Sequence, residues 1–139
     1  MNISIYNNNG RIIVKSELTP ALKGIEIDYN KTIIKLGIIL LTDEKLRELN
    51  LTYLKSDYYT DIISFNYSEN PLKVEGELYI SRDRIRENAK KYKISEKEEM
   101  YRVVIHGVLH LTGEEDKKNE QRKHMQIKEN QYLKLICFT

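Results

Sequence analysis

Two histidines spaced four residues apart, His106 and His110, are the strongest candidates for chemistry in this sequence of 139 residues. On a helix this spacing puts both imidazoles on one face, one turn apart, where together they can grip a divalent metal. Gly113 follows shortly after, where a left-handed residue would end the helix and let the chain turn back. Asp116 lies beyond that turn and can supply a third ligand. The spacing therefore predicts a metal site made by His106, His110 and Asp116.

The residue after the first histidine separates this pattern from that of the HExxH peptidases. Gly107 stands where those enzymes carry a general-base glutamate, so a peptidase would need a base from elsewhere. A glycine inside an apolar helix costs roughly 1 kcal/mol relative to alanine, which indicates that something approaches the helix backbone closely at this position. Two buried histidines bonded to backbone groups are the alternative interpretation of the pair.

Other side chains compete with Asp116 for the third position. Glu114 and Glu115 precede it directly, but a ligand three residues after the glycine recurs in the extended zincin patterns and favours position 116. His124 lies further along, on a charged segment typical of an exposed helix, and we interpret it as a surface histidine.

The histidines need a helix to hold them, and the sequence predicts one that begins at Ser95. A serine with a glutamate three residues later, here Glu98, fits a capping box. From residue 100 to residue 111 the segment is apolar nearly all round, which is typical of a helix buried in the centre of a domain.

The remaining elements predict an α+β fold with a single small mixed sheet of about four strands. Strands are expected at 2–6, 33–42, 60–67 and 74–81, with Ile63 and Phe65 facing Leu78 and Ile80 in an antiparallel pair. Further helices are expected at 19–28, 43–53, 81–93 and 119–135, the first with Thr19 as its cap and Pro20 at its first position. The metal is expected at the C-terminal end of the histidine helix.

Length and composition describe one ordinary globular domain spanning 1–139. Hydrophobic residues make up 40% and charged residues 32%, and the net charge of +2 is too small to argue for nucleic-acid binding by itself. The single cysteine, Cys137, excludes an internal disulfide and fits a reducing cytosol. Since neither a signal peptide nor a membrane-spanning run is evident, we expect a cytoplasmic protein without membrane contact.

The segment from His106 to Gly113 resembles the signature of the YbeY family, metal-dependent endoribonucleases that mature ribosomal RNA. Family members generally show HGxLHLxGYDH, and the matching residues are His106, Gly107, Leu109, His110, Leu111 and Gly113. The resemblance continues, in family order and spacing, through Leu49-Asn50, Thr60 to Phe65 (TDIISF for the family's TDVLSF), Gly76 to Ser81, Met125 and Glu129.

This resemblance implies a zincin-like metal helix and one Zn²⁺ per chain, held by His106, His110 and Asp116, which would carry catalysis through a metal-bound water. It also implies that the metal lies in a cleft beside Ser64, Phe65 and Leu54. It implies a single-strand-specific endoribonuclease that acts in maturation of the 16S rRNA 3′ end and in ribosome quality control. Its partners would be ribosomal RNA and small-subunit ribosomal proteins. Lys55 and Tyr58, which flank the matched TDIISF segment, and Ser64 within it are the candidate substrate-binding residues.

The sequence departs from the family pattern at two positions. Asp116 replaces the third histidine, and zinc accepts a carboxylate oxygen alongside imidazole. Leu54 stands where the family commonly carries an arginine that is implicated in RNA chemistry. The second change supports an alternative, a non-catalytic ribosome-assembly protein whose metal only pins the helix to the following loop.

Overall fold

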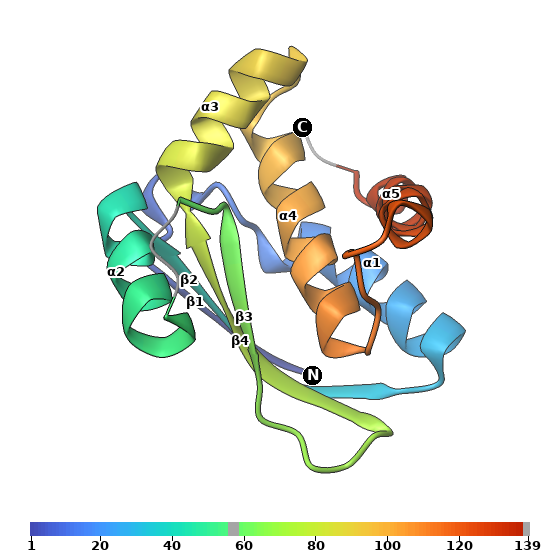
Figure 1. Cartoon of the computed structure of the whole chain (residues 1–139). Helices are drawn as coiled ribbons and strands as arrows, with labels where there is room; N and C mark the ends of the chain where they lie inside the picture. Colours follow the sequence, from blue (N-terminus) through green and yellow to red (C-terminus); the bar gives the residue numbers. More distant parts are fainter. Residues whose placement is uncertain (56–58, 138–139) are drawn as a thin grey trace.

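Four strands and five α-helices make up the structure, a computed structural model that describes residues 1–55 and 59–137. Figure 1 shows their arrangement. The elements are β1 (Asn2–Tyr6), a short 3-10 helix (Asn9–Arg11), α1 (Lys15–Tyr29), β2 (Thr32–Leu41), α2 (Asp43–Leu54), β3 (Ile62–Asn66), β4 (Lys73–Ser81), α3 (Arg82–Tyr92), α4 (Glu96–Leu111) and α5 (Asn119–Leu133). The α+β class is confirmed, and every strand and every α-helix except α1 begins and ends within two residues of its predicted bounds.

The four strands form one mixed sheet in the order β1-β2-β4-β3. Strands β1, β2 and β4 are parallel, whereas β3 runs antiparallel to β4 at the edge. The antiparallel pairing is as predicted, but its register is not, because Ile62 and Ser64 lie opposite Ile80 and Leu78. Strand β3 carries apolar residues on both faces, so its pattern does not decide which set faces the core.

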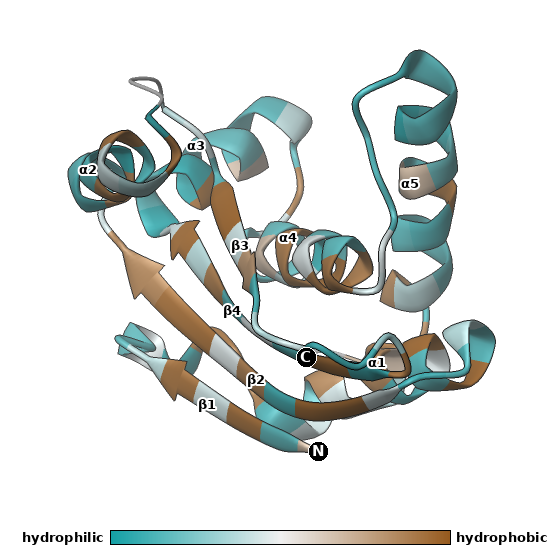
Figure 2. Cartoon of the chain, turned by 60° about the horizontal axis from the view of Figure 1, so that its bottom comes forward, coloured by the Kyte–Doolittle hydropathy of each residue, from teal (hydrophilic) through white to brown (hydrophobic). Residues whose placement is uncertain are grey.

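Helices α1, α4 and α5 lie on one side of this sheet (Figure 2). Helix α4 packs on β3 and β4, and α5 forms an outer layer against α4 and α1. Gly107 permits the close contact, because a Cβ there would lie 2.6 Å from Cδ1 of Ile62 and 2.7 Å from Cδ2 of Leu78. The predicted close approach to the backbone of the histidine helix is thus confirmed, and its cause is the sheet beneath the helix.

Local sequence signals set the ends of α4. The hydroxyl of Ser95 accepts a hydrogen bond from the backbone N–H of Glu98 at 3.0 Å, as expected of a cap. At the other end Gly113 adopts φ +110°, which lets the chain leave the helix in the conformation that favours glycine. Both ends of the histidine helix therefore lie where the sequence predicts them.

The start of α1 corrects a prediction. The helix begins at Lys15 rather than at Thr19, and Pro20 lies inside it. Leu18 is fully buried one turn before Leu22, so the buried stripe begins earlier than the Thr-Pro signal suggests. Burial of that extra turn outweighs the one backbone hydrogen bond that Pro20 cannot donate. None of the described helices is long and apolar enough to cross a bilayer.

Candidate metal centre

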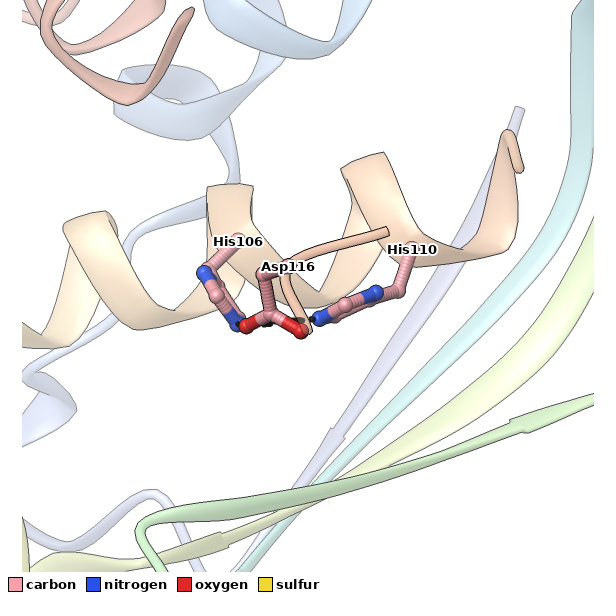
Figure 3. Close-up of side chains that lie close together, drawn as sticks. All are labelled: His106, His110 and Asp116. Carbon is pink, nitrogen blue, oxygen red and sulfur yellow. Dashed lines mark hydrogen bonds and ion pairs between the residues drawn. The ribbon is translucent and has the colours of Figure 1, made fainter. Parts of the chain in front are cut away.

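The last two turns of α4 and the loop after it bring His106, His110 and Asp116 together, as Figure 3 shows. Nε2 of His106 lies 3.0 Å from Nε2 of His110. Oδ2 of Asp116 lies 3.2 Å from the first of these nitrogens and 3.4 Å from the second. The three side chains are half-buried, with 24%, 26% and 35% of their surface exposed, so their ligand atoms form a triangle that solvent reaches.

The size of this triangle fits a tetrahedral metal. Zinc binds imidazole nitrogen and carboxylate oxygen at about 2.0–2.2 Å, so two ligand atoms at tetrahedral corners lie roughly 3.3–3.5 Å apart. The three observed separations are 3.0, 3.2 and 3.4 Å. Two imidazoles and one carboxylate occupy three corners, and the fourth corner is left for water or a substrate atom.

Asp116 is held in place by the turn after α4 and by α5. The N–H of Gly113 donates to the carbonyl of His110 at 3.0 Å, which closes the helix and reverses the chain. The guanidinium of Arg122, on α5, donates to the carbonyls of Asp116 at 3.1 Å and of Lys117 at 2.8 Å. Both contacts are short in sequence, because they run from the first turn of α5 back to the loop directly before it, but no motif of the sequence assigns Arg122 this role.

His106 is oriented from behind by a buried carboxylate. Its Nδ1 lies 2.6 Å from Oε2 of Glu129, whose side chain is only 9% exposed and lies 3.6 Å from the guanidinium of Arg102. A carboxylate only accepts hydrogen bonds, so Nδ1 carries the proton and Nε2 presents its lone pair to the triangle. The sequence marks Glu129 only as a match to a family pattern and does not assign it this role.

His110 is oriented by the backbone instead. Its Nδ1 lies 2.8 Å from the carbonyl oxygen of Glu114, which again leaves the Nε2 lone pair for the triangle. The alternative ligands are engaged elsewhere, since the carboxylate of Glu114 lies 2.6 Å from His124 and 3.2 Å from the hydroxyl of Tyr29. Within residues 1–55 and 59–137, the triad is the one group of three or more such side chains close enough to share an ion.

Burial and charge act in opposite directions on His106. Burial lowers its pKa, but the hydrogen bond and charge of Glu129, together with the charge of Asp116, outweigh burial and raise it. Nearby, burial raises the pKa of Asp61, and burial together with the charge of Asp61 raises that of Glu99. The metal-free site is therefore an environment that favours bound protons.

A cleft of about 670 Å³ opens on the triangle, beside β3 and the end of α2. The three candidate ligands line it, as do Leu54 and Ser64, so the expected position of the cleft agrees with the structure. Its full lining is Asn50, Leu54, Thr60, Asp61, Ile62, Ile63, Ser64, Asn66, His106, His110, Leu111, Gly113, Glu114, Glu115 and Asp116. Four carboxylates and no lysine or arginine occur in this lining as far as the structure describes it.

A second cavity of about 590 Å³ also borders His106 and is lined by Glu99, Arg102 and Glu129 among others. Asp61, His106 and Asp116 line both cavities. His106 therefore borders the cleft and also a second cavity whose lining includes the carboxylate that orients it.

The structure separates the three candidate substrate-binding residues. Ser64 lies on β3 and lines the cleft. Lys55 ends α2 in the left-handed conformation, is exposed and lies outside the cleft lining. Tyr58 lies outside the residues that the structure describes.

Comparisons with known proteins agree with this geometry. The sequence model of the family described as Endoribonuclease YbeY matches residues 2–136. Endoribonuclease YbeY of Phocaeicola vulgatus is 41% identical over 124 residues, 89% of each chain, and that of Chlorobium phaeobacteroides is 39% identical over 134 residues, 96% of this chain and 94% of its own. The solution structure of TM1509 from Thermotoga maritima superposes with a TM-score of 0.67 at 26% identity, covering 96% of this chain and 87% of that one. The chain belongs to the YbeY family.

Proposed function

We propose that this protein is a metal-dependent endoribonuclease that hydrolyses phosphodiester bonds in single-stranded RNA. Membership of the Endoribonuclease YbeY family supports the nuclease activity and the RNA substrate. The observation that carries the metal dependence is the triangle of ligand atoms from His106, His110 and Asp116, which opens on a cleft of about 670 Å³. We propose zinc, one ion per chain, because two imidazoles and a carboxylate at tetrahedral spacing suit it.

A metal held there would supply Lewis acidity, which polarises a phosphoryl oxygen and lowers the pKa of water. The protein itself would fix the orientation of the metal ligands and determine which side chain near the metal can accept a proton. Glu129 and the carbonyl of Glu114 lock both histidines with Nε2 toward the centre. Gly107 leaves no glutamate at the peptidase position, and Asp61, whose pKa burial raises, is the nearest candidate to hold a proton beside the cleft.

The biological role that we propose is maturation of the 3′ end of 16S ribosomal RNA and ribosome quality control in the cytoplasm, beside small-subunit ribosomal proteins. The family resemblance supports this role. A second function is non-catalytic ribosome assembly with a structural metal. One observation favours it: Leu54 lines the cleft at the family's arginine position, and the described residues of the lining include no lysine or arginine.

The test is to measure bound metal per chain and cleavage of single-stranded RNA on the same preparations. His110→Ala and Asp116→Ala should lose both metal and cleavage while keeping the fold by circular dichroism. His124→Ala is the matched control, because this half-exposed histidine lies outside the triad and should change neither quantity. Stoichiometric metal without cleavage by the parent protein would instead favour the assembly role.

A further inference from the structure

Strand β3 forms one edge of the sheet, and that edge borders the candidate metal cleft. No strand within the described part of the chain pairs with its outer side. Residues of this strand from Ile62 to Ser64, and Asn66, line the same cleft as the triad. An open strand edge therefore runs beside the ligand triangle.

The hydrogen bonds to β4 show which backbone groups of β3 face outward. The carbonyl of Asp61 accepts from the N–H of Ser81 at 2.9 Å, and the N–H of Tyr67 donates to the carbonyl of Glu75 at 2.8 Å. Since backbone groups alternate along an antiparallel strand, odd-numbered residues of β3 face β4 and even-numbered residues face away. The N–H and C=O groups of Ser64 and Asn66 therefore point to the open side.

The side chains of the same two residues add further donors. Ser64 lies opposite Leu78, on the sheet face that α4 covers, so its hydroxyl faces the cleft. Oδ1 of Asn66 accepts from the N–H of Ser68 at 2.9 Å, so the amide keeps its NH₂ group as a donor, and Asn66 lines the cleft. We call these backbone and side-chain groups of Ser64 and Asn66 the β3 donor edge.

The charge of the cleft makes neutral donors important. Its lining contains Asp61, Glu114, Glu115 and Asp116 and, within the described residues, no lysine or arginine. A phosphate that enters can therefore be held by a bound metal and by uncharged N–H and O–H groups, but not by a cationic side chain of the lining. Backbone N–H, serine and asparagine are regular phosphate contacts in nucleic-acid complexes.

We propose that the β3 donor edge binds the sugar–phosphate backbone of single-stranded RNA across the cleft from the metal. This inference rests on the proposed endoribonuclease function and adds the residues that position the substrate. Ser64 and Asn66 lie roughly 6.8 Å apart along the strand, which one extended nucleotide can span. Their N–H groups suit phosphate oxygens, and their outward carbonyls accept from 2′-hydroxyl groups, so the edge favours RNA over DNA.

Two substitutions at one position test the backbone and side-chain donors separately. Asn66→Ala removes the amide, and Asn66→Pro also removes the outward N–H without breaking a bond to β4, as edge strands tolerate. On single-stranded RNA we expect KM to rise about fivefold for alanine and by a similar further factor for proline, with kcat within about twofold. Parental KM values in both variants, with intact fold and metal content, would overturn the proposal.

A charge substitution keeps the test valid if the proline variant does not fold. Asn66→Lys should lower KM and make its logarithm about 0.7 steeper against the logarithm of salt concentration, because one phosphate gains a cation. Ile27→Lys adds the same charge at a position that is 78% exposed on α1 and should change neither quantity. Equal effects of the two lysines would contradict the proposal.

The outcomes separate this inference from the function on which it rests. If the parent protein cleaves RNA and the Asn66 variants match it, the donor edge is wrong and the nuclease stands. If the parent does not cleave, binding of the same RNA to the zinc-loaded protein is measured instead. Weaker binding by Asn66→Pro would then support the donor edge without the nuclease. Displacement of that RNA by a β-forming peptide that binds more tightly than RNA would overturn the proposal in favour of a polypeptide ligand.

Discussion

His106 and His110 present the same atom to the same point, 3.0 Å apart, but they are held there in different ways. Nδ1 of His110 is hydrogen-bonded to the carbonyl of Glu114, four residues further along the chain, which the turn at Gly113 brings back to the imidazole. Nδ1 of His106 is hydrogen-bonded to the carboxylate of Glu129, which lies on α5, 23 residues further along the chain. The first arrangement forms with the end of a helix, whereas the second needs tertiary docking.

The two acceptors also differ in what they do to the imidazole. A carbonyl oxygen fixes the tautomer and the ring direction. A buried carboxylate does the same and in addition stabilises the protonated ring, which is why the pKa of His106 is raised despite burial. His106 is therefore expected to bind a metal strongly at high pH and to lose it to protonation as the pH falls.

Removal of either imidazole is expected to have the largest effect on metal binding and RNA cleavage. The effect should be the same for both histidines, although they are oriented by different acceptors. His106→Ala and His110→Ala should each lose the metal and reduce RNA cleavage by at least about 10³-fold, since a lost Lewis acid costs several kcal/mol of transition-state stabilisation. Metal analysis and initial rates on folded protein measure both quantities. A variant that kept its metal would show that the triangle is not the metal centre.

Removal of the Glu129 charge, which orients His106, is expected to have the next largest effect. It tests directly whether a carboxylate acceptor makes His106 a stronger ligand than a carbonyl acceptor would. Glu129→Gln keeps the size of the side chain but loses the charge, and zinc affinity should fall about 10- to 100-fold in competition with a chromogenic chelator. Glu120→Gln, an identical change at an exposed position of α5, should leave affinity unchanged. An unaltered affinity in Glu129→Gln would mean that the carboxylate only fills space.

Replacement of the third ligand would place a third imidazole in the triangle, one that neither Glu129 nor the carbonyl of Glu114 orients. Asp116→His should keep one metal per chain and raise the preference for zinc over manganese by roughly tenfold, because imidazole suits zinc better than a hard, oxygen-preferring ion. Paired titrations with the two metals measure the ratio. Loss of metal would show that Arg122 holds the loop in a form that only a short carboxylate fits.

The smallest expected effect appears in the stability of the metal-free protein. Because the pKa of folded His106 is raised above its ordinary value of 6.5, its protonation contributes stability that is fully present below 6.5 and disappears as pH rises through the raised value. The destabilisation by Glu129→Gln should therefore be larger at pH 5.5 than at pH 9, by roughly 1 kcal/mol. Urea unfolding in excess chelator measures the difference, and a gap independent of pH would contradict the assigned pairing.

The predictions that succeeded depend on short stretches of chain. The spacing of His106 and His110, the cap at Ser95 and the break at Gly113 are local, so they predict where the histidines point and where Asp116 returns. The orienting contact of Glu129 depends on how α5 docks against α4, which no local pattern encodes. The predicted register of β3 was wrong for a related reason, since that strand carries apolar residues on both faces and pairing with β4 decides between them.

Helix α5 carries both Glu129, behind His106, and Arg122, which grips the loop at Asp116. Two of the three candidate ligands are thus held directly by one peripheral helix. His110 is linked to that helix only through Glu114, whose carboxylate lies 2.6 Å from His124 of α5. Local opening of α5, which needs far less free energy than global unfolding, would release His106 and Asp116 at once. We therefore expect the lifetime of a bound metal to follow hydrogen exchange in α5 rather than the stability of the sheet.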